Sequence, residues 1–225
     1  MTHVLSFILL LLLTNYCMGA SIGFSEGVME SVIKLEQGKV SGPFGIFANC
    51  IEKQSHIKFE WSEYPTRRLF SMVDQNMLDI VYPVGITEQR NKVAIASKPV
   101  FSSERLWVYI GKPPDFNDRK LSIVVTRGTP TEETIKKLGY SNLSIVKYDA
   151  LLPMLSTKRV AAALMPKKIF TGLVETYGLA GAYQGYQTQI FNKREIVFYL
   201  SKRFANDNLP SINQAIDACQ HVKVQ

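Results

Sequence analysis

The residue whose type and spacing most suggest chemistry is Arg90, at the end of the stretch LDIVYPVGITEQR. An apolar, β-branched run from Leu78 to Val84 predicts a buried strand, and Gly85 ends it. Thr87 is a good N-cap for the helix that should follow. Arg90 would then lie in the first helical turn, where the partial positive charge of the backbone disfavours a cation. An arginine at that position therefore needs an explanation.

Two interpretations of Arg90 stay open on spacing alone. Its side chain could reach solvent or pair with Glu88 or Glu104, and a surface ion pair of that kind contributes at most ~1 kcal/mol. Alternatively, its guanidinium group faces a cleft and holds a carboxylate through two parallel hydrogen bonds, a task for which the geometry of arginine is suited.

A second turn has the same layout. The stretch LSIVVTRGTPTEE, residues 121–133, reads as a buried strand, a glycine turn and a helix that starts near Pro130. Ordinary capping would explain it, with Thr129 as the N-cap and Glu132 completing a capping box. Free N–H groups near Gly128 and Thr129 could instead hold an anion. Because ligands of open α/β sheets bind beyond the carboxyl ends of the strands, both turns are candidate sites.

Strands that alternate with helices must position these turns. Their order predicts an α/β fold, with one mainly parallel unit before the linker Gly111–Lys120 and a second unit after it. The linker is rich in Pro, Gly, Asp and Asn. The last strong strand is EIVFYLS, residues 195–201, and a closing helix is expected over residues 209–220.

Composition excludes several classes of function. The formal net charge of +7 favours an anionic partner, but Lys and Arg are scattered and do not alternate with aromatic residues, so no nucleic-acid surface is expected. The three histidines and the cysteines have no metal-ligand spacing and form no catalytic triad, and we expect no metal and no cofactor. Tyr64, just before Pro65 at a helix start, is a candidate to line a cleft, whereas Trp107 reads as core packing.

The first twenty residues have the pattern of a secretory signal. Val4 to Leu13 is a nearly pure apolar run, too short to span a bilayer, and the small residues Gly19 and Ala20 offer cleavage points. We therefore expect a signal peptide over residues 1–20 and export to the periplasm. An uncleaved anchor is the alternative.

Two cysteines remain after residue 20, Cys50 and Cys219. An exported chain with an even number of cysteines favours a disulfide between them. Two separate buried thiols, each behaving as a small hydrophobic residue, would fit the sequence equally well.

The stretch LDIVYPVGITEQRNKVAIASKPVF resembles the central signature of bacterial extracytoplasmic solute-binding proteins of family 3, the amino-acid-binding type. The signature elements are an Asp-led strand at Asp79, a Thr-Glu-x-Arg turn at residues 87–90, and a Ser-x-Pro segment at residues 97–99. YPTRRLFSMV resembles the Pro-x-x-Arg helix start of many members, and SKRFANDNLPSINQAI their closing strand and helix. The resemblance covers nearly the whole chain after residue 20.

This resemblance implies a two-lobed periplasmic-binding-protein-like fold of type II, with two mainly parallel sheets joined by two crossover strands. Lobe 1 would comprise residues 21–108 and 191–225, and lobe 2 residues 109–190. A small-molecule ligand with a carboxylate or another anionic group would lie in the cleft, which closes by hinge motion. The implied partner is an ATP-driven importer permease or a membrane sensor, and the protein would be a monomer.

The resemblance also assigns roles to residues. In the family, the arginine of the Thr-Glu-x-Arg turn binds the α-carboxylate of the ligand, which implies this role for Arg90. The preceding turn would assist through Gly85 and, less directly, Pro83. The helix start of the second lobe would close on the same carboxylate through Gly128 and Thr129.

The chain departs from the family pattern where the α-amino group of the ligand is normally held. A carboxylate is usual there, but RVAAALMPKKIF has Pro166, with Lys167 and Lys168 beside it, and Lys167 is a candidate ligand-binding residue. In the first strand, Phe24 and Glu26 are the nearest substitutes for the usual aromatic-Pro-Pro-Phe run. An anion without an α-amino group therefore fits better than a standard amino acid, unless Glu26 supplies the missing negative charge.

The sequence thus predicts an exported solute-binding protein that captures a small anionic or amino-acid-like ligand, for uptake or sensing, and catalyses nothing. A dehydratase-like enzyme of the same fold, with Glu26 as its base, is one alternative. An envelope sensor or accessory protein without a role in transport is another.

Overall fold

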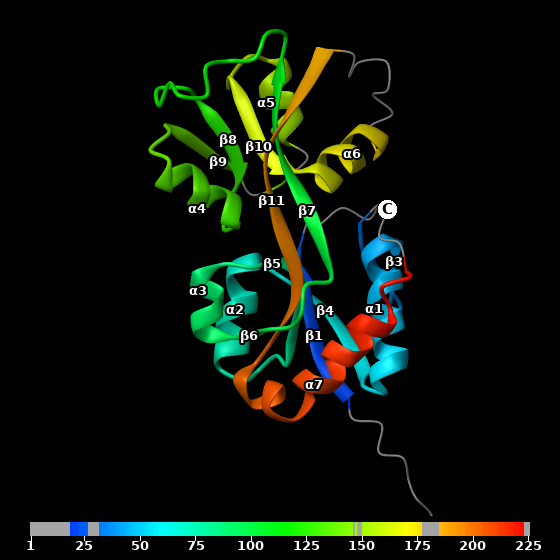
Figure 1. The fold of residues 1–225 in the computed structure, drawn as a ribbon. Coiled ribbons are helices and arrows are strands. Elements are labelled where there is room, and N and C mark those ends of the chain that lie inside the picture. The colour runs from blue at the N-terminus through cyan, green and yellow to red at the C-terminus, as the bar shows by residue number, and fades with distance from the viewer. Residues whose placement is uncertain (1–18, 27–31, 146, 148–149, 177–184, 223–225) are drawn as a thin grey trace, which may run out of the picture.

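The computed structural model describes residues 19–26, 32–145, 147, 150–176 and 185–222. The chain folds into two α/β lobes, one above the other in Figure 1, and two long strands run from one lobe into the other. Of the predicted signal peptide, residues 1–18 lie outside the described residues. In the described ranges, no helix is both long enough and apolar enough to cross a membrane.

Lobe 1 is built around β1 (Gly19–Ser25), which pairs in parallel with β4 (Lys58–Tyr64) on one side and β5 (Ile80–Gly85) on the other. Helices cover both faces of this sheet: α1 (Gly42–Ser55) and α7 (Lys202–Ala218) on one, α2 (Thr66–Asp74) and α3 (Glu88–Val93) on the other (Figure 1). Burial on both faces explains why the central strands are apolar almost throughout instead of alternating. A hairpin of β2 (Lys34–Glu36) and β3 (Lys39–Ser41) and the short β6 (Ile95–Ala96) complete the lobe.

Lobe 2 repeats this plan on a smaller scale. Strand β8 (Ile123–Thr126) pairs in parallel with β9 (Asn142–Ile145) and β10 (Ala162–Pro166). The remaining helices are α4 (Pro130–Lys137), α5 (Leu151–Ser156) and α6 (Lys167–Thr176). The expected turns after β5 and β8 therefore both lie at carboxyl ends of parallel strands.

Two crossover strands, β7 (Phe101–Ile110) and β11 (Tyr186–Leu200), join the lobes. They pair with each other in antiparallel fashion, and this pairing makes one continuous sheet in the order β4-β1-β5-β11-β7-β10-β8-β9. The predicted two-lobed α/β architecture is confirmed, although its two sheets are hydrogen-bonded into one. The predicted lobe boundaries at 108/109 and 190/191 fall inside these two strands.

Two element boundaries predicted from the sequence are wrong. Strand β11 begins at Tyr186, not near residue 195, because its first half is polar and exposed and carries no apolar pattern; its pairing with β7 holds it in place. Helix α7 begins at Lys202, where the hydroxyl of Ser201 accepts a hydrogen bond from the Phe204 amide at 3.2 Å. Pro210, which the sequence suggests near the helix start, lies inside the helix.

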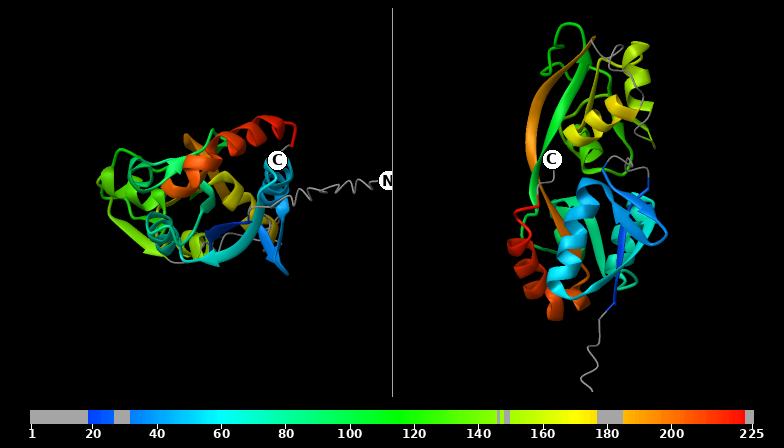
Figure 2. Two further views of the ribbon diagram at one scale, coloured as in Figure 1. Left: turned by 90° about the horizontal axis from the view of Figure 1, so that it is seen from below. Right: turned by 90° about the vertical axis from the view of Figure 1, so that its right-hand side faces the viewer.

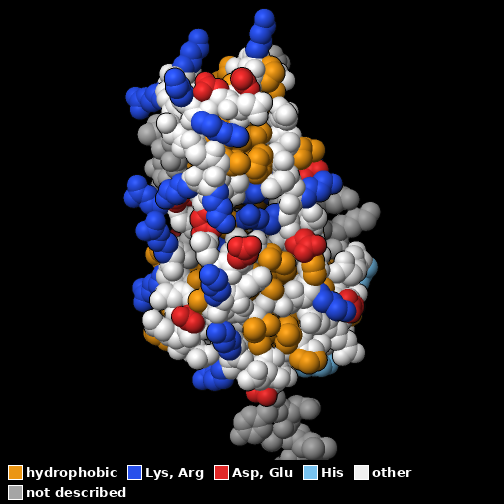
Figure 3. Space-filling view, turned by 60° about the vertical axis from the view of Figure 1, so that its left-hand side comes forward, with side chains coloured by type: hydrophobic (Ala, Val, Ile, Leu, Met, Phe, Trp, Pro, Cys, Tyr) orange, Lys and Arg blue, Asp and Glu red, His pale blue; other side chains and the backbone are white. Residues whose placement is uncertain are grey.

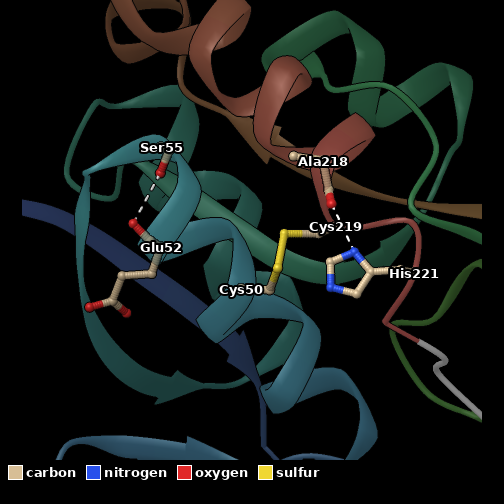
Figure 4. Close-up of a disulfide and its surroundings, with 6 residues drawn as sticks. All are labelled: Cys50, Glu52, Ser55, Ala218, Cys219 and His221. Carbon is tan, nitrogen blue, oxygen red and sulfur yellow. Dashed lines mark hydrogen bonds between the residues drawn. A yellow bond between two sulfur atoms is a disulfide. The ribbon is translucent and has the colours of Figure 1, made fainter.

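A disulfide fastens the first and last helices of lobe 1. Helices α1 and α7 lie side by side (Figures 1 and 2), and Cys50 and Cys219 are bonded across them with their Cα atoms 6.1 Å apart (Figure 4). Cys219 is fully buried. The bond links residues 169 positions apart in the sequence.

Candidate functional site

A cavity of about 140 Å³ lies between the two lobes, and both lobes and both crossover strands line it. Lobe 1 contributes Ser25, Val32, Phe44, Thr66, Pro83, Val84, Gly85 and Arg90. Lobe 2 contributes Thr129, Pro130, Thr131, Pro166, Lys168 and Ile169, and the crossover strands contribute Ser103, Arg105, Arg194 and Ile196. The cavity thus adjoins the two helix starts that the sequence singles out.

Arg90 is held in place by the turn that precedes it. The hydroxyl of Thr87 caps α3 by accepting a hydrogen bond from the Arg90 amide at 3.2 Å, as predicted for this residue. The guanidinium Nη1 donates to the carbonyl oxygen of Gly85 at 2.7 Å, and the guanidinium carbon lies 4.5 Å from the centre of the Phe70 ring. Arg90 is only 8% exposed, so its charge is directed into the protein and not to solvent.

Gly85 makes room for a second arginine. A β-carbon at this position would lie 2.4 Å from Cδ of Arg194, a distance that no real side chain tolerates. Only glycine therefore allows the Arg194 side chain to lie over the end of β5. Arg90 and Arg194 both contact this one residue, from α3 and β11 respectively.

The turn after β8 differs in detail from a capping box. Thr129 is the N-cap residue of α4, but its hydroxyl donates to the carbonyl oxygen of Thr126 at 2.7 Å and makes no capping bond. Glu132 accepts a hydrogen bond from the amide of Gly128 at 2.5 Å, one residue before the N-cap, and also pairs with Lys136 at 2.6 Å. The capping-box prediction is therefore wrong by one residue, because Gly128, with φ of +75°, turns its amide toward Glu132.

The structure brings together part of the predicted site. Gly85, Arg90 and Thr129 line the cavity, as does Pro83. Pro166, which takes the place of the usual carboxylate, lines it as well.

Five other predicted residues lie outside the cavity lining. Phe24 is buried in the core, with its ring centre 6.0 Å from that of Trp61. Glu26 is exposed at the end of β1, and Tyr64 packs against the apolar cluster of α2 and β5. Lys167 forms an ion pair with Glu104 at 2.9 Å. The fifth, Gly128, approaches lobe 1: a β-carbon there would lie 3.3 Å from Cγ of Arg67.

Three cationic residues that line the cavity were not predicted from the sequence to bind a ligand: Arg105, Lys168 and Arg194. Arg105 and Arg194 lie on the crossover strands, where neither a turn nor a helix start marks them. The one sequence signal that could have marked Arg105 is its position as a charged residue directly before the apolar run Leu106–Tyr109. We refer to Arg90, Arg105, Lys168 and Arg194 together as the cavity cations.

The electrostatics of the site follow from these four side chains. Among the described residues, no carboxylate lines the cavity. Burial, together with the charge of Arg194, lowers the pKa of the Arg105 guanidinium to about 10. Burial also lowers the pKa of Arg194, while nearby Glu133 opposes that shift. Figure 3 shows Lys and Arg side chains at the waist between the lobes, on the face that it presents, with Asp and Glu side chains among them.

The arrangement of the cavity cations suits the binding of an anion. Guanidinium groups donate hydrogen bonds in a fork that matches a carboxylate. In the described part of the chain, no group of His, Cys, Asp and Glu side chains could hold a metal ion.

Comparisons with known proteins give structural matches only. No family model matches the chain, and no curated protein matches it. An ancestral arginine-binding protein bound to arginine is similar over 90% of this chain and 92% of its own, with 19% identity and a TM-score of 0.74. The GluR0 ligand-binding core in complex with L-glutamate is similar over 92% and 94%, with 16% identity and a TM-score of 0.75. The arginine-, lysine-, histidine-binding protein ArtJ from Geobacillus stearothermophilus is similar over 88% of both chains, with 16% identity and a TM-score of 0.73.

These matches span both lobes and almost the full length of each protein, and at such low identities they establish the fold. The chain therefore has the two-lobed α/β fold of amino-acid-binding solute-binding proteins and of the GluR0 ligand-binding core.

Proposed function

We propose that the protein captures a small anion in the cavity between its lobes, as an exported solute-binding protein that serves uptake or sensing. The observation that carries the proposal is the charge of the cavity, which four cations and no described carboxylate line. Cations lose hydration in a cavity of this kind, and the negative charge of a bound anion compensates for that loss. Arg90 would grip one carboxylate of the ligand, and Thr129 would approach the same group from lobe 2.

The ligand would lack an α-amino group. Two proteins of similar fold are bound to arginine and to L-glutamate, and each of these ligands carries an ammonium group that needs an acceptor. Here Pro166 lines the cavity and offers no side-chain acceptor, and Lys168 lines it and would repel an ammonium group. Glu26, which could have supplied a negative charge or acted as a base, is exposed and outside the lining, which supports binding without catalysis.

Hinge motion of the lobes would accompany binding. We propose lobes of residues 21–108 with 191–225, and of residues 109–190, which close around the ligand by bending in β7 and β11. The protein would act as a periplasmic monomer and deliver its ligand to an ATP-driven permease or present it to a membrane sensor.

A thermal-shift screen with matched ligand pairs tests the proposal. Glutarate and glutamate differ only in the ammonium group, as do butyrate and 2-aminobutyrate. A ligand that binds only the folded state stabilises it by ~2.7 kcal/mol at a hundredfold excess over its Kd. We expect the acid without the ammonium group to give the larger shift in each pair, and Arg90→Gln to abolish the shift.

Arg127→Gln is the matched control, because Arg127 is exposed in lobe 2 and does not line the cavity. It removes one positive charge and should leave the shifts unchanged. Stronger shifts with the amino acids would overturn the proposal.

A further inference from the structure

Arg105 is the least expected of the cavity cations. It lies on β7 and is only 4% exposed. Its Nε donates to the Asn192 side-chain oxygen at 2.8 Å and its Nη1 to the Thr134 hydroxyl at 2.9 Å, and its guanidinium carbon lies 5.1 Å from the centre of the Phe191 ring. All these partners are neutral. Within the described residues, no carboxylate forms an ion pair with Arg105, so a buried charge at the cavity has no counter-charge from the protein.

Arg194 brings a second guanidinium group close to Arg105. It lies on β11, which pairs with β7 beside it, and the charge of Arg194 contributes to the lowered pKa of Arg105. Arg194 also lies against Gly85, whose carbonyl oxygen accepts from Arg90. Arg194 is thus near both other arginines, and the three positive charges repel one another in the absence of a ligand.

Lys168 approaches the cavity from lobe 2. It lies in the first turn of α6, and its neighbour Lys167 is engaged with Glu104 outside the cavity. Lys168 lines the cavity together with Pro166. The lobe 2 side of the cavity is therefore cationic as well. An amino acid would need a hydrogen-bond acceptor for its ammonium group on that side.

The number of cations at the cavity favours a ligand with two anionic groups over a ligand with one. A monoanion held by Arg90 would leave Arg105 and Lys168 without an ion-pair partner among the described residues, whereas Arg194 already has the carboxylate of Glu133 nearby. A second anionic group on the same ligand could lie against Arg105 and supply the counter-charge that this buried guanidinium lacks. A cavity of about 150 Å³ holds a molecule the size of benzene, so the volume of about 140 Å³ limits the ligand to a compact one.

We propose that the cavity binds a compact dianion, a dicarboxylate of about four carbons without an ammonium group. One carboxylate binds Arg90 on lobe 1, and the other binds Arg105 on the crossover strand, with Lys168 and Arg194 beside the ligand. This inference rests on the proposed function and adds to it the second anionic group and the residue that receives it.

Calorimetric titration of the purified protein with butyrate, succinate and inorganic phosphate tests the inference. Butyrate and succinate share a four-carbon chain and differ in one carboxylate. Because truncation of one member of a buried charge pair costs several-fold to many-fold in affinity, we expect succinate to bind at least about tenfold more tightly than butyrate. Arg105→Gln should remove this preference, because it lowers the affinity for succinate much more than the affinity for butyrate.

Lys168→Gln is a second variant, in case the buried Arg105 substitution impairs folding. It changes a partly exposed residue at a helix start, and it should weaken succinate binding more than butyrate binding. Arg127→Gln again serves as the control that lowers the net charge equally without altering the cavity lining.

The outcomes separate this inference from the proposed function. Equal affinities for butyrate and succinate, with binding still lost in Arg90→Gln, would overturn the dianion and leave the proposed function standing. Phosphate binding as tightly as succinate would overturn the two-carboxylate arrangement in favour of a single anion site. Absence of binding by all three probes would overturn both proposals.

Discussion

Arg105→Met should stabilise the unliganded protein while it destroys dianion binding. Methionine is unbranched and apolar and fills a site of similar length, so the substitution removes the charge with little loss of packing. If Arg105 served only packing, the substitution would destabilise the unliganded protein and leave dianion binding intact. The prediction therefore separates a binding role for Arg105 from a structural one.

The expected magnitude follows from the surroundings of Arg105. The pKa of Arg105, lowered to about 10 by burial, means that the folded state disfavours the charged guanidinium by ~3 kcal/mol at neutral pH. The substitution also removes two hydrogen bonds, worth ~1 kcal/mol each. Their partners are not stranded, because Asn192 is exposed to water and the Thr134 hydroxyl still donates to the Pro130 carbonyl oxygen.

The difference predicts a net stabilisation of about 1 kcal/mol, which raises the melting temperature of a protein of this size by about 2–4 °C. Thermal and urea denaturation without ligand measure this change in stability. The same experiments with succinate present measure binding. Arg127→Met is the control and should change stability by less than about 0.5 kcal/mol. A loss of more than about 2 kcal/mol in unliganded Arg105→Met, with the succinate shift intact, would refute the reasoning.

Three further predictions concern other parts of the molecule. Lys168→Gln should weaken anion binding more than Lys167→Gln does, and the reverse order in a titration would support the residue first suggested by the sequence. Replacing Cys50 and Cys219 with serine should lower the free energy of unfolding by about 3–5 kcal/mol, because the bond closes a long loop; an unchanged melting temperature in both oxidising and reducing buffer would contradict this. Gly85→Ala should keep the fold but displace the side chain of Arg194, which lies over it. The affinity for the anion should fall roughly 2- to 10-fold, because Arg194 is forced into an off-rotamer conformation. Wild-type affinity in this variant would show that Arg194 is not needed.

Local patterns in the sequence were sufficient for much of the fold and for one half of the site. Continuous apolar runs marked the central strands, and Thr87 was recognised as a cap because a capping hydroxyl acts on an amide three residues away. The anomaly of a cation in a first helical turn pointed to Arg90, which the structure places in the cavity lining. These features are readable because their causes lie within a few residues.

The long crossover strand shows where local patterns fail. The first half of β11 is polar and exposed, and only its pairing with β7 makes it a strand. Arg194 lies in this strand and Arg105 in its partner, so neither could be placed at a ligand before the pairing was known. The burial of Arg105 and the partial burial of Arg194 are visible only in three dimensions.

The sequence by itself determined the alternation of strands and helices, the cap at Thr87 and the pair of cysteines available for a bond. Only the tertiary structure decided that Cys50 meets Cys219, that Lys168 and not Lys167 lines the cavity, and that arginines from both crossover strands converge there. The physical reason is that neighbouring residues on a helix point about 100° apart. Which of them faces a ligand depends on how distant elements pack, and the burial of charge depends on the same packing.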